Sequence, residues 1–354
     1  MSEKLPVNPD ILKWARQTAG LQVPEVARKM GKEVNTILSW ERGDSTPTYI
    51  QLEKLAYQVY KRPLALFFFP GPPTEETPRQ AFRTLPDHEI EMMSSRMHYL
   101  LKQALAMQIN LTELNDYVNP AKRNIINDLK FNSDSSAKTM AAQVREYLGI
   151  DLDTQFNWND LHDALKAWRN SLEEHGVFVF KEAFKDDSMS GFCLHHQHFP
   201  LIYVNNSTSK SRQIFSIFHE LAHLLLGTGG IDTRSDDYID DLEGDARKIE
   251  ILCNRFAGAF LVPDADFSQR IVGITINEHS IKDLADKYCV SREVILRKCL
   301  DRRLISRDYY KKKAEEWADE AKKARKKKKG KGGSYCLIIS IRIASPVYGK
   351  NLSH

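Results

Sequence analysis

The stretch FHELAHLLLG at residues 218–227 limits what this chain can fold into, because it places two histidines and a glutamate inside an apolar run. Phenylalanine, alanine and leucines surround His219, Glu220 and His223, so the segment is predicted to be a buried helix. Ionisable side chains are costly to bury unless something pairs with them or coordinates them. A bound metal ion is the partner that this pattern favours.

The spacing of the three residues indicates how a metal would be held. Residues four apart on a helix lie one above the other, so His219 and His223 project from one face. Glu220 projects about a quarter-turn away, beside such an ion rather than onto it. This is the H-E-x-x-H arrangement, in which two imidazoles hold Zn²⁺ and the glutamate takes a proton from water. The pattern predicts a zinc site with Glu220 as the general base.

A catalytic zinc also needs a third protein ligand and one open position. The acidic candidates downstream are Asp236, Asp237, Asp240, Asp241, Glu243, Asp245 and Glu250. Glu250 adjoins the buried face of a second apolar helix expected over residues 246–262, which follows an acidic loop over 231–245. Asp245 satisfies the same helical argument from one turn earlier. Spacing alone does not choose between these two carboxylates.

These two helices resemble the ImmA/IrrE family of metallopeptidases. Its signature is H-E-x-x-H followed by a helix of the form E-x-x-A-N-x-F-A-x-x-L-L-x-P, and the second helix here reads EILCNRFAGAFLVP. The resemblance covers roughly residues 175–305 and implies a zincin-like metallopeptidase with Glu250 as the third zinc ligand. Cys253 and Phe260 depart from the signature at positions that do not touch the chemistry.

The N-terminal stretch LQVPEVARKMGKEVNTILSWERGDSTPTYIQLEKLA resembles the XRE/Cro-type helix-turn-helix. Its matching anchors are Ala27, Gly31, Ile37, Trp40, Glu41, Gly43, Pro47 and Leu52. In such modules the helix that starts here near Val34 enters the major groove. The candidate DNA-contacting residues are Asn35, Thr36 and Ser39 for bases, and Arg28 and Arg42 for phosphates.

Two positions depart from the usual helix-turn-helix pattern. Val23 stands where a DNA-contacting glutamine is usual, and Glu33 stands where a helix-capping serine is usual. Residues 1–87 carry twelve basic and ten acidic side chains, which is a weak charge bias for a DNA-binding domain. A helix-turn-helix retained for protein contacts is therefore the alternative to DNA binding.

The predicted fold class is α+β and mostly α-helical, with an all-α helix-turn-helix domain and a zincin-like domain. Short β-rich runs at 176–180, 191–196 and 200–206 predict a small antiparallel sheet before the zinc helix. The predicted divisions are a helix-turn-helix domain (1–70), a Pro-rich linker (71–90), a helical connector (91–174), a metallopeptidase core (175–275), a small helix-turn-helix-like subdomain (276–310) and a Lys-rich helix end and tail (311–354).

Charge and cysteine content exclude several classes of protein. The net charge of +4 is misleading, because residues 311–331 hold eleven basic and four acidic side chains and leave about −3 for the rest. The five cysteines are widely spaced without a C-x-x-C pair, which argues against disulfides and a cysteine-based zinc site. No apolar run approaches the ~20 residues that span a bilayer, so no membrane role and a cytoplasmic location are expected.

Other residues carry weaker hypotheses. His195, His196 and His198 are candidates for a cleft or a second metal, although surface histidines in a turn are commoner. Tyr203 and Tyr238 are candidates for stabilising an oxyanion. We expect Arg212 to pair with the acidic loop.

The motifs and the resemblance together predict a zinc-dependent endopeptidase that cleaves a partner protein. The resemblance implies a transcriptional repressor as that partner, and control of stress or mobile-element genes. One alternative is a non-proteolytic XRE regulator whose metallopeptidase-like domain senses a ligand or partner. Another is an antitoxin-like binding module. A complete H-E-x-x-H favours the enzyme, because a pure sensor would not need Glu220.

Overall fold

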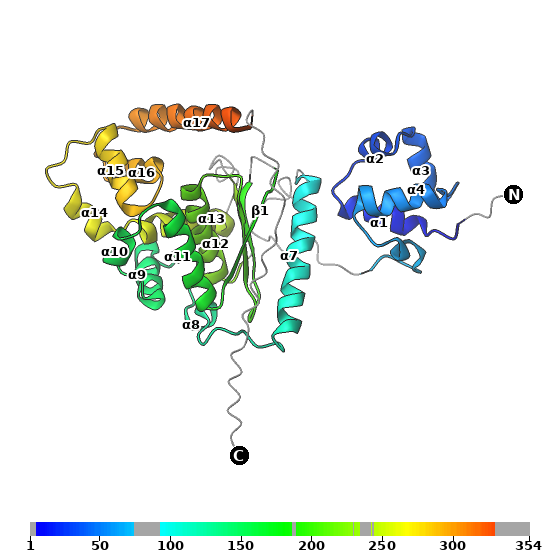
Figure 1. Cartoon of the computed structure of the whole chain (residues 1–354), viewed down its shortest axis with the longest axis horizontal. Coiled ribbons are helices and arrows are strands. Elements are labelled where there is room, and N and C mark those ends of the chain that lie inside the picture. The colour runs from blue at the N-terminus through cyan, green and yellow to red at the C-terminus, as the bar shows by residue number, and fades with distance from the viewer. Residues whose placement is uncertain are drawn as a thin grey trace, which may run out of the picture. The chain divides into compact units, whose positions relative to one another are not determined.

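The computed structural model describes residues 5–73, 93–185, 189–228, 230–233, 242 and 244–329 (Figure 1). Within these residues most of the chain is helical, which confirms the predicted fold class. None of the helices in this part of the chain is both long enough and apolar enough to cross a membrane.

The N-terminal helices form a small domain of their own. They are α1 (Pro9–Thr18), α2 (Val23–Met30), α3 (Val34–Arg42), α4 (Tyr49–Glu53), the π-helical segment η1 (Lys54–Tyr60) and the 3-10 segment η2 (Leu64–Phe68). Ile11, Leu12, Ile37, Leu52 and Phe67 are among the apolar side chains that fill one shared core. Gly31 and Gly43 end α2 and α3 in the left-handed conformation, which favours glycine.

A buried ion pair also holds the N-terminal domain together. The Arg16 guanidinium donates to both carboxylate oxygens of Glu41, at 2.7 and 2.9 Å, and links α1 to α3. Burial and two hydrogen bonds make this pair stronger than an exposed one. The side chain of Glu41, an anchor of the sequence motif, therefore fixes the helix that is expected to meet DNA.

The following helices are α7 (Ser95–Leu114), α8 (Ile125–Asp128), α9 (Ala137–Leu148), α10 (Leu152–Phe156) and α11 (Leu161–Glu174). Ser94, Ser136 and Asp160 cap the N-termini of α7, α9 and α11, because each side chain accepts a backbone N–H from the first turn. The mostly helical connector and its polar interruption before α9 agree with the sequence pattern.

A four-stranded sheet follows, in the order β1-β3-β2-β4. The strands are β1 (Phe178–Glu182), β2 (Met189–Leu194), β3 (Leu201–Asn205) and β4 (Gly230–Thr233). The predicted sheet exists, but it is mixed rather than wholly antiparallel, because β3 lies between β1 and β2 and runs parallel to β1. The acidic segment predicted as a loop also contributes the edge strand β4.

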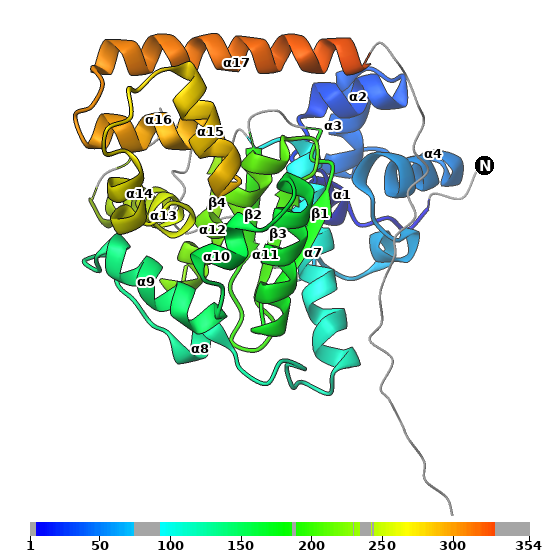
Figure 2. The same ribbon diagram turned by 60° about the vertical axis from the view of Figure 1, so that its left-hand side comes forward.

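Helices cover both faces of this sheet (Figures 1 and 2). On one face, Met97, Leu100 and Leu101 of α7 share a core with Phe192 and Tyr203 of the strands. On the other face lies α12 (Lys210–Leu225), which packs against β2, β3 and β4 and is covered by α13 (Gly244–Leu261). α12 is therefore enclosed between the sheet and a second helix.

The C-terminal helices are α14 (Asp264–Arg270), α15 (Glu278–Tyr288), α16 (Arg292–Asp301) and α17 (Arg307–Lys329). Between α15 and α16, Cys289 takes a left-handed conformation with φ of 54°, and the chain turns sharply there. This arrangement agrees with the helix-turn-helix pattern in the sequence. The Lys-rich run up to Lys329 continues α17, while the remainder of the predicted tail lies outside the described residues.

Candidate metal centre

The zinc helix predicted from the sequence is α12. It begins after Ser209, whose hydroxyl accepts the Arg212 N–H at 3.2 Å, and nearly every side chain from Gln213 to Leu225 is buried. His219, Glu220 and His223 are at most 1% exposed. Three ionisable side chains on so enclosed a helix require partners from its neighbours.

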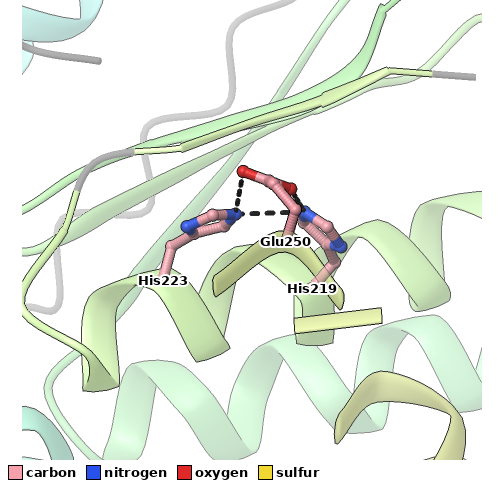
Figure 3. A group of neighbouring side chains, drawn as sticks. All are labelled: His219, His223 and Glu250. Atoms are coloured by element: carbon pink, nitrogen blue, oxygen red, sulfur yellow. Dashed lines mark hydrogen bonds and ion pairs between the residues drawn. The ribbon is translucent and has the colours of Figure 1, made fainter. Parts of the chain in front are cut away.

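α13 supplies a carboxylate directly opposite the two imidazoles (Figure 3). The Nε2 atoms of His219 and His223 lie 3.1 Å apart. Glu250 Oε2 lies 3.4 Å from the first Nε2, and Glu250 Oε1 lies 3.3 Å from the second. No other trio of His, Cys, Asp or Glu side chains in the described part of the chain converges in a way that could hold a metal.

These distances are close to those between neighbouring ligand atoms of a zinc ion. Zn–N and Zn–O bonds of about 2.0–2.2 Å place neighbouring ligand atoms roughly 3.3–3.5 Å apart. The three separations of 3.1–3.4 Å fall at or just below that range. One oxygen of Glu250 lies near each imidazole, so the three side chains form a group that could hold one metal ion.

Contacts on the far side of each imidazole indicate its tautomer. His219 Nδ1 lies 3.0 Å from Asn254 Oδ1, and His223 Nδ1 lies 3.2 Å from Thr228 Oγ1. Oxygen acceptors at both Nδ1 atoms favour protonation there, which leaves a lone pair on each Nε2. Two lone pairs and a carboxylate then converge on one point, which is an arrangement that attracts a cation.

The electrostatics of Glu250 agree with this reading. Burial alone would raise its pKa, and positive charge on the adjacent His223 and His219 would lower it below its usual value. With both imidazoles neutral, a bound cation would be the positive charge that keeps this carboxylate ionised. An ionised carboxylate is the form that binds a metal.

Sequence spacing left Asp245 as the rival of Glu250, and the structure separates them. Glu250 is fully buried beside the histidines, whereas the Asp245 side chain is 77% exposed and lies 3.4 Å from Lys248 Nζ. Asp245 lies in the first turn of α13, five residues before Glu250. Asp236, Asp237, Asp240, Asp241 and Glu243 lie outside the described residues.

The Glu220 side chain lies between its own helix, α12, and strand β2. Its Cγ would lie 3.6 Å from a Cβ added to Gly191, and the same Cβ would meet the Tyr203 carbonyl oxygen at 3.1 Å and Ser216 Cβ at 3.4 Å. The tight contact is the one with the Tyr203 carbonyl oxygen of β3, whereas the two contacts with α12 are ordinary van der Waals distances. A bulge in β2 falls directly before Gly191. Gly191 therefore marks the part of β2 that Glu220 lies against.

The remaining candidates from the sequence include the histidines near the end of β2 and Tyr203. His196 Nδ1 accepts the backbone N–H groups of His198 and Phe199 at 3.1 and 3.0 Å, so it shapes the β2–β3 turn. Neither it, His195 nor His198 belongs to a metal-binding trio within the described residues. Tyr203 stacks on Phe192 with ring centroids 5.1 Å apart, in the core shared with α7.

That core lies on the opposite face of the sheet from α12, because Gly191, next to Phe192 on the strand, faces α12. An oxyanion role for Tyr203 is therefore wrong. Tyr238 lies outside the described residues. Arg212 Nε donates to Ser190 Oγ at 3.0 Å, and most of the acidic loop expected to pair with it is outside those residues as well.

The N-terminal candidates lie on or beside α3. Asn35 is exposed, and Thr36 and Ser39 are half-buried. The Ser39 hydroxyl is engaged within the domain, because it donates to Thr36 O at 2.9 Å and lies 2.6 Å from Ser45 Oγ. Arg28 is exposed on α2, and Arg42 pairs with Asp44 at 2.8 Å. Glu33 is the N-cap of α3 but its side chain makes no cap bond.

Sequence reasoning did not assign roles to Asn254 and Thr228. Asn254 follows Glu250 by four residues, so the helical period that turns Glu250 toward the two histidines also puts Asn254 on the same face. Thr228 follows Gly227, which marks the end of the zinc helix. Both signals are present in the sequence, but only the fold shows which side chains they reach.

Comparison with known proteins agrees with this geometry. Residues 172–300 match the IrrE N-terminal-like domain, a peptidase family, and residues 12–56 match a helix-turn-helix family. A search of curated proteins found no match to this chain.

Among solved structures, the chain is similar to a Mycobacterium tuberculosis transcriptional regulator, with 19% identity and a TM-score of 0.31. The match covers 46% of this chain and 45% of that one, which is less than half the length of the regulator. The two domain matches coincide with the two motifs in the sequence. The chain therefore contains a region that matches an XRE-type helix-turn-helix, followed by a region that matches an IrrE N-terminal-like domain.

Proposed function

We propose that this protein is a zinc-dependent endopeptidase that cleaves a partner protein in the cytoplasm. The observation that carries the proposal is the convergence of three buried side chains, His219 and His223 of α12 and Glu250 of α13. Glu220 follows His219 directly on α12 and is buried as well. His219, His223 and Glu250 hold the metal, and Glu220 is the general base. The family match at residues 172–300 supports the same reaction class.

Each residue has a distinct task in this reaction. His219, His223 and Glu250 bind the ion through three groups and leave a fourth position for substrate or water. When bound, zinc polarises the scissile carbonyl and lowers the pKa of water to about 7. Glu220 accepts the proton of the attacking water and returns it to the leaving amine. Asn254 and Thr228 orient the imidazoles through Nδ1.

The fusion to a helix-turn-helix suggests the class of substrate. A DNA-binding module would bring the peptidase to the same operators as other regulators, so a transcriptional repressor is the substrate that we propose. Its cleavage would switch on the genes that it silences, such as stress or mobile-element genes. The match of residues 12–56 to a helix-turn-helix family supports a regulatory role.

Incubation with purified candidate repressors tests the peptidase proposal. We expect the zinc-loaded full chain to convert one of them into discrete fragments, as resolved by gel electrophoresis and mass spectrometry. A zinc chelator should abolish the fragments, and added zinc should restore them. Cleavage that resists the chelator, or a screen of regulators with no fragments, would contradict the proposal.

We also propose that the N-terminal domain binds DNA through α3. Asn35 and Thr36 lie in its first turn and are the proposed base contacts, together with Ser39. Arg28 and Arg42 are the proposed phosphate contacts. In gel-shift assays of the full chain, Asn35→Ala should cost about 1–3 kcal/mol of discrimination at particular bases. Arg28→Ala should weaken all sequences alike and flatten the salt dependence.

A substitution at Glu33 tests the same DNA-binding proposal in the opposite direction. Its carboxylate lies at the N-terminus of α3 without a cap bond, where it would repel phosphate. Glu33→Ser should therefore strengthen binding to any operator. If no genomic fragment is retained at low salt, the domain is a protein-docking device that recruits the substrate.

A further inference from the structure

The zinc helix ends in a turn that returns to its own histidine. α12 stops at Leu225, and Gly227 takes a left-handed conformation with φ of 70°. The Gly227 N–H donates to Leu224 O at 3.0 Å, and the Thr228 N–H donates to His223 O at 2.9 Å. These two bonds form the Schellman pattern of helix ends, which brings Thr228 back to the level of His223.

The Thr228 hydroxyl makes a second and third contact with the same residue. Oγ1 donates its single proton to His223 O at 3.1 Å and lies 3.2 Å from His223 Nδ1. Because that proton is committed to the carbonyl, Oγ1 acts as the acceptor toward Nδ1. His223 is then protonated on Nδ1, and its Nε2 lone pair faces His219 and Glu250.

We propose that Thr228 is a positioning residue for the metal site, which fixes the tautomer and ring orientation of His223. The inference rests on the proposed function, because it assigns His223 as a metal ligand. Schellman turns often carry an apolar contact between these two positions, and here a hydrogen bond takes its place. The end of the helix is thereby part of the metal centre.

Three substitutions isolate the hydroxyl. Thr228→Val keeps the β-branched shape and removes the hydrogen bonds of Oγ1, whereas Thr228→Ser keeps a hydroxyl. Thr112→Val is the matched control, because Thr112 is also half-buried and its hydroxyl donates to Gln108 O at 2.8 Å, on α7. Zinc affinity of the full chain is measured by competition with a chromophoric chelator. The visible spectrum of the cobalt-loaded protein reports the coordination geometry.

We expect Thr228→Val to weaken zinc binding about 10-fold or more and to alter the cobalt spectrum. Thr228→Ser and Thr112→Val should stay close to the wild type in both measurements. Thr228→Ala replaces the valine variant if circular dichroism shows that the latter is unfolded.

Two results would overturn the inference while leaving the proposed function in place. One is wild-type zinc affinity and spectrum in a folded variant that lacks the hydroxyl. The other is a serine variant as weak as the valine variant, which would make the hydroxyl irrelevant. A wild-type chain that binds no zinc would overturn the inference and the proposed function together.

Discussion

Glu250→Ala is expected to lose zinc at neutral pH, with a larger effect than the ~10–100-fold cost of removing a group that only orients a ligand. The substitution removes a carboxylate whose two oxygens lie 3.3 and 3.4 Å from the two Nε2 atoms. Two imidazoles remain, and they cannot supply the third bond that a zinc site of this type uses. Zinc per chain after dialysis, measured by mass spectrometry, is the readout.

Asp245→Ala is the control on the same helix. Its carboxylate is mostly exposed and pairs with Lys248, so its removal should leave zinc content unchanged. A second variant, Glu250→Gln, preserves the shape of the side chain but removes its charge, and it should also bind zinc weakly. Zinc loss in the Asp245 variant with retention in the Glu250 variant would move the third ligand and undo the proposed site.

The two histidines could be predicted from the sequence because their geometry is local. A helical period of 3.6 places His219 and His223 on one face whatever the rest of the chain does. Glu250 belongs to a different helix, so its approach depends on how α13 packs on α12. Sequence spacing did not distinguish Glu250 from Asp245 as the third zinc ligand, and only the family resemblance favoured Glu250 before the fold was known.

The order and direction of the strands in the sheet could not be predicted from the sequence. Short β-rich runs predicted three strands, but they carry no information on which strands become neighbours. The parallel pairing of β1 with β3 and the edge strand β4 follow from tertiary contacts instead. The role proposed for Tyr203 failed for the same reason, because its facing depends on which side of the sheet α12 covers.

The contacts around the imidazoles could be predicted only in part from the sequence. Thr228 was visible as the residue after a helix-ending glycine, and Asn254 as a neighbour of Glu250 on one helix face. Neither motif says that the side chain reaches a histidine nitrogen. That information requires the crossing of α12 and α13 and the turn after Leu225.

Glu220→Gln is expected to keep the fold and the zinc but to lose cleavage by about 10²–10⁴-fold, because only the proton acceptor is removed. Glu220 is fully buried and its Cγ lies close to Gly191, so an amide of the same shape should be accommodated there. It is not one of the three residues that converge as candidate metal ligands. Zinc content and activity should therefore respond separately to this substitution.

The most direct measurement compares the wild type and Glu220→Gln, both loaded with one zinc per chain, on the same cleaved partner protein. The rate of fragment formation is followed at equal concentrations of enzyme and substrate. We predict fragments from the wild type, and a rate near the uncatalysed background from the variant despite its full complement of zinc. Undiminished cleavage by the zinc-loaded variant would contradict the assignment of this site as a Glu220-dependent metallopeptidase.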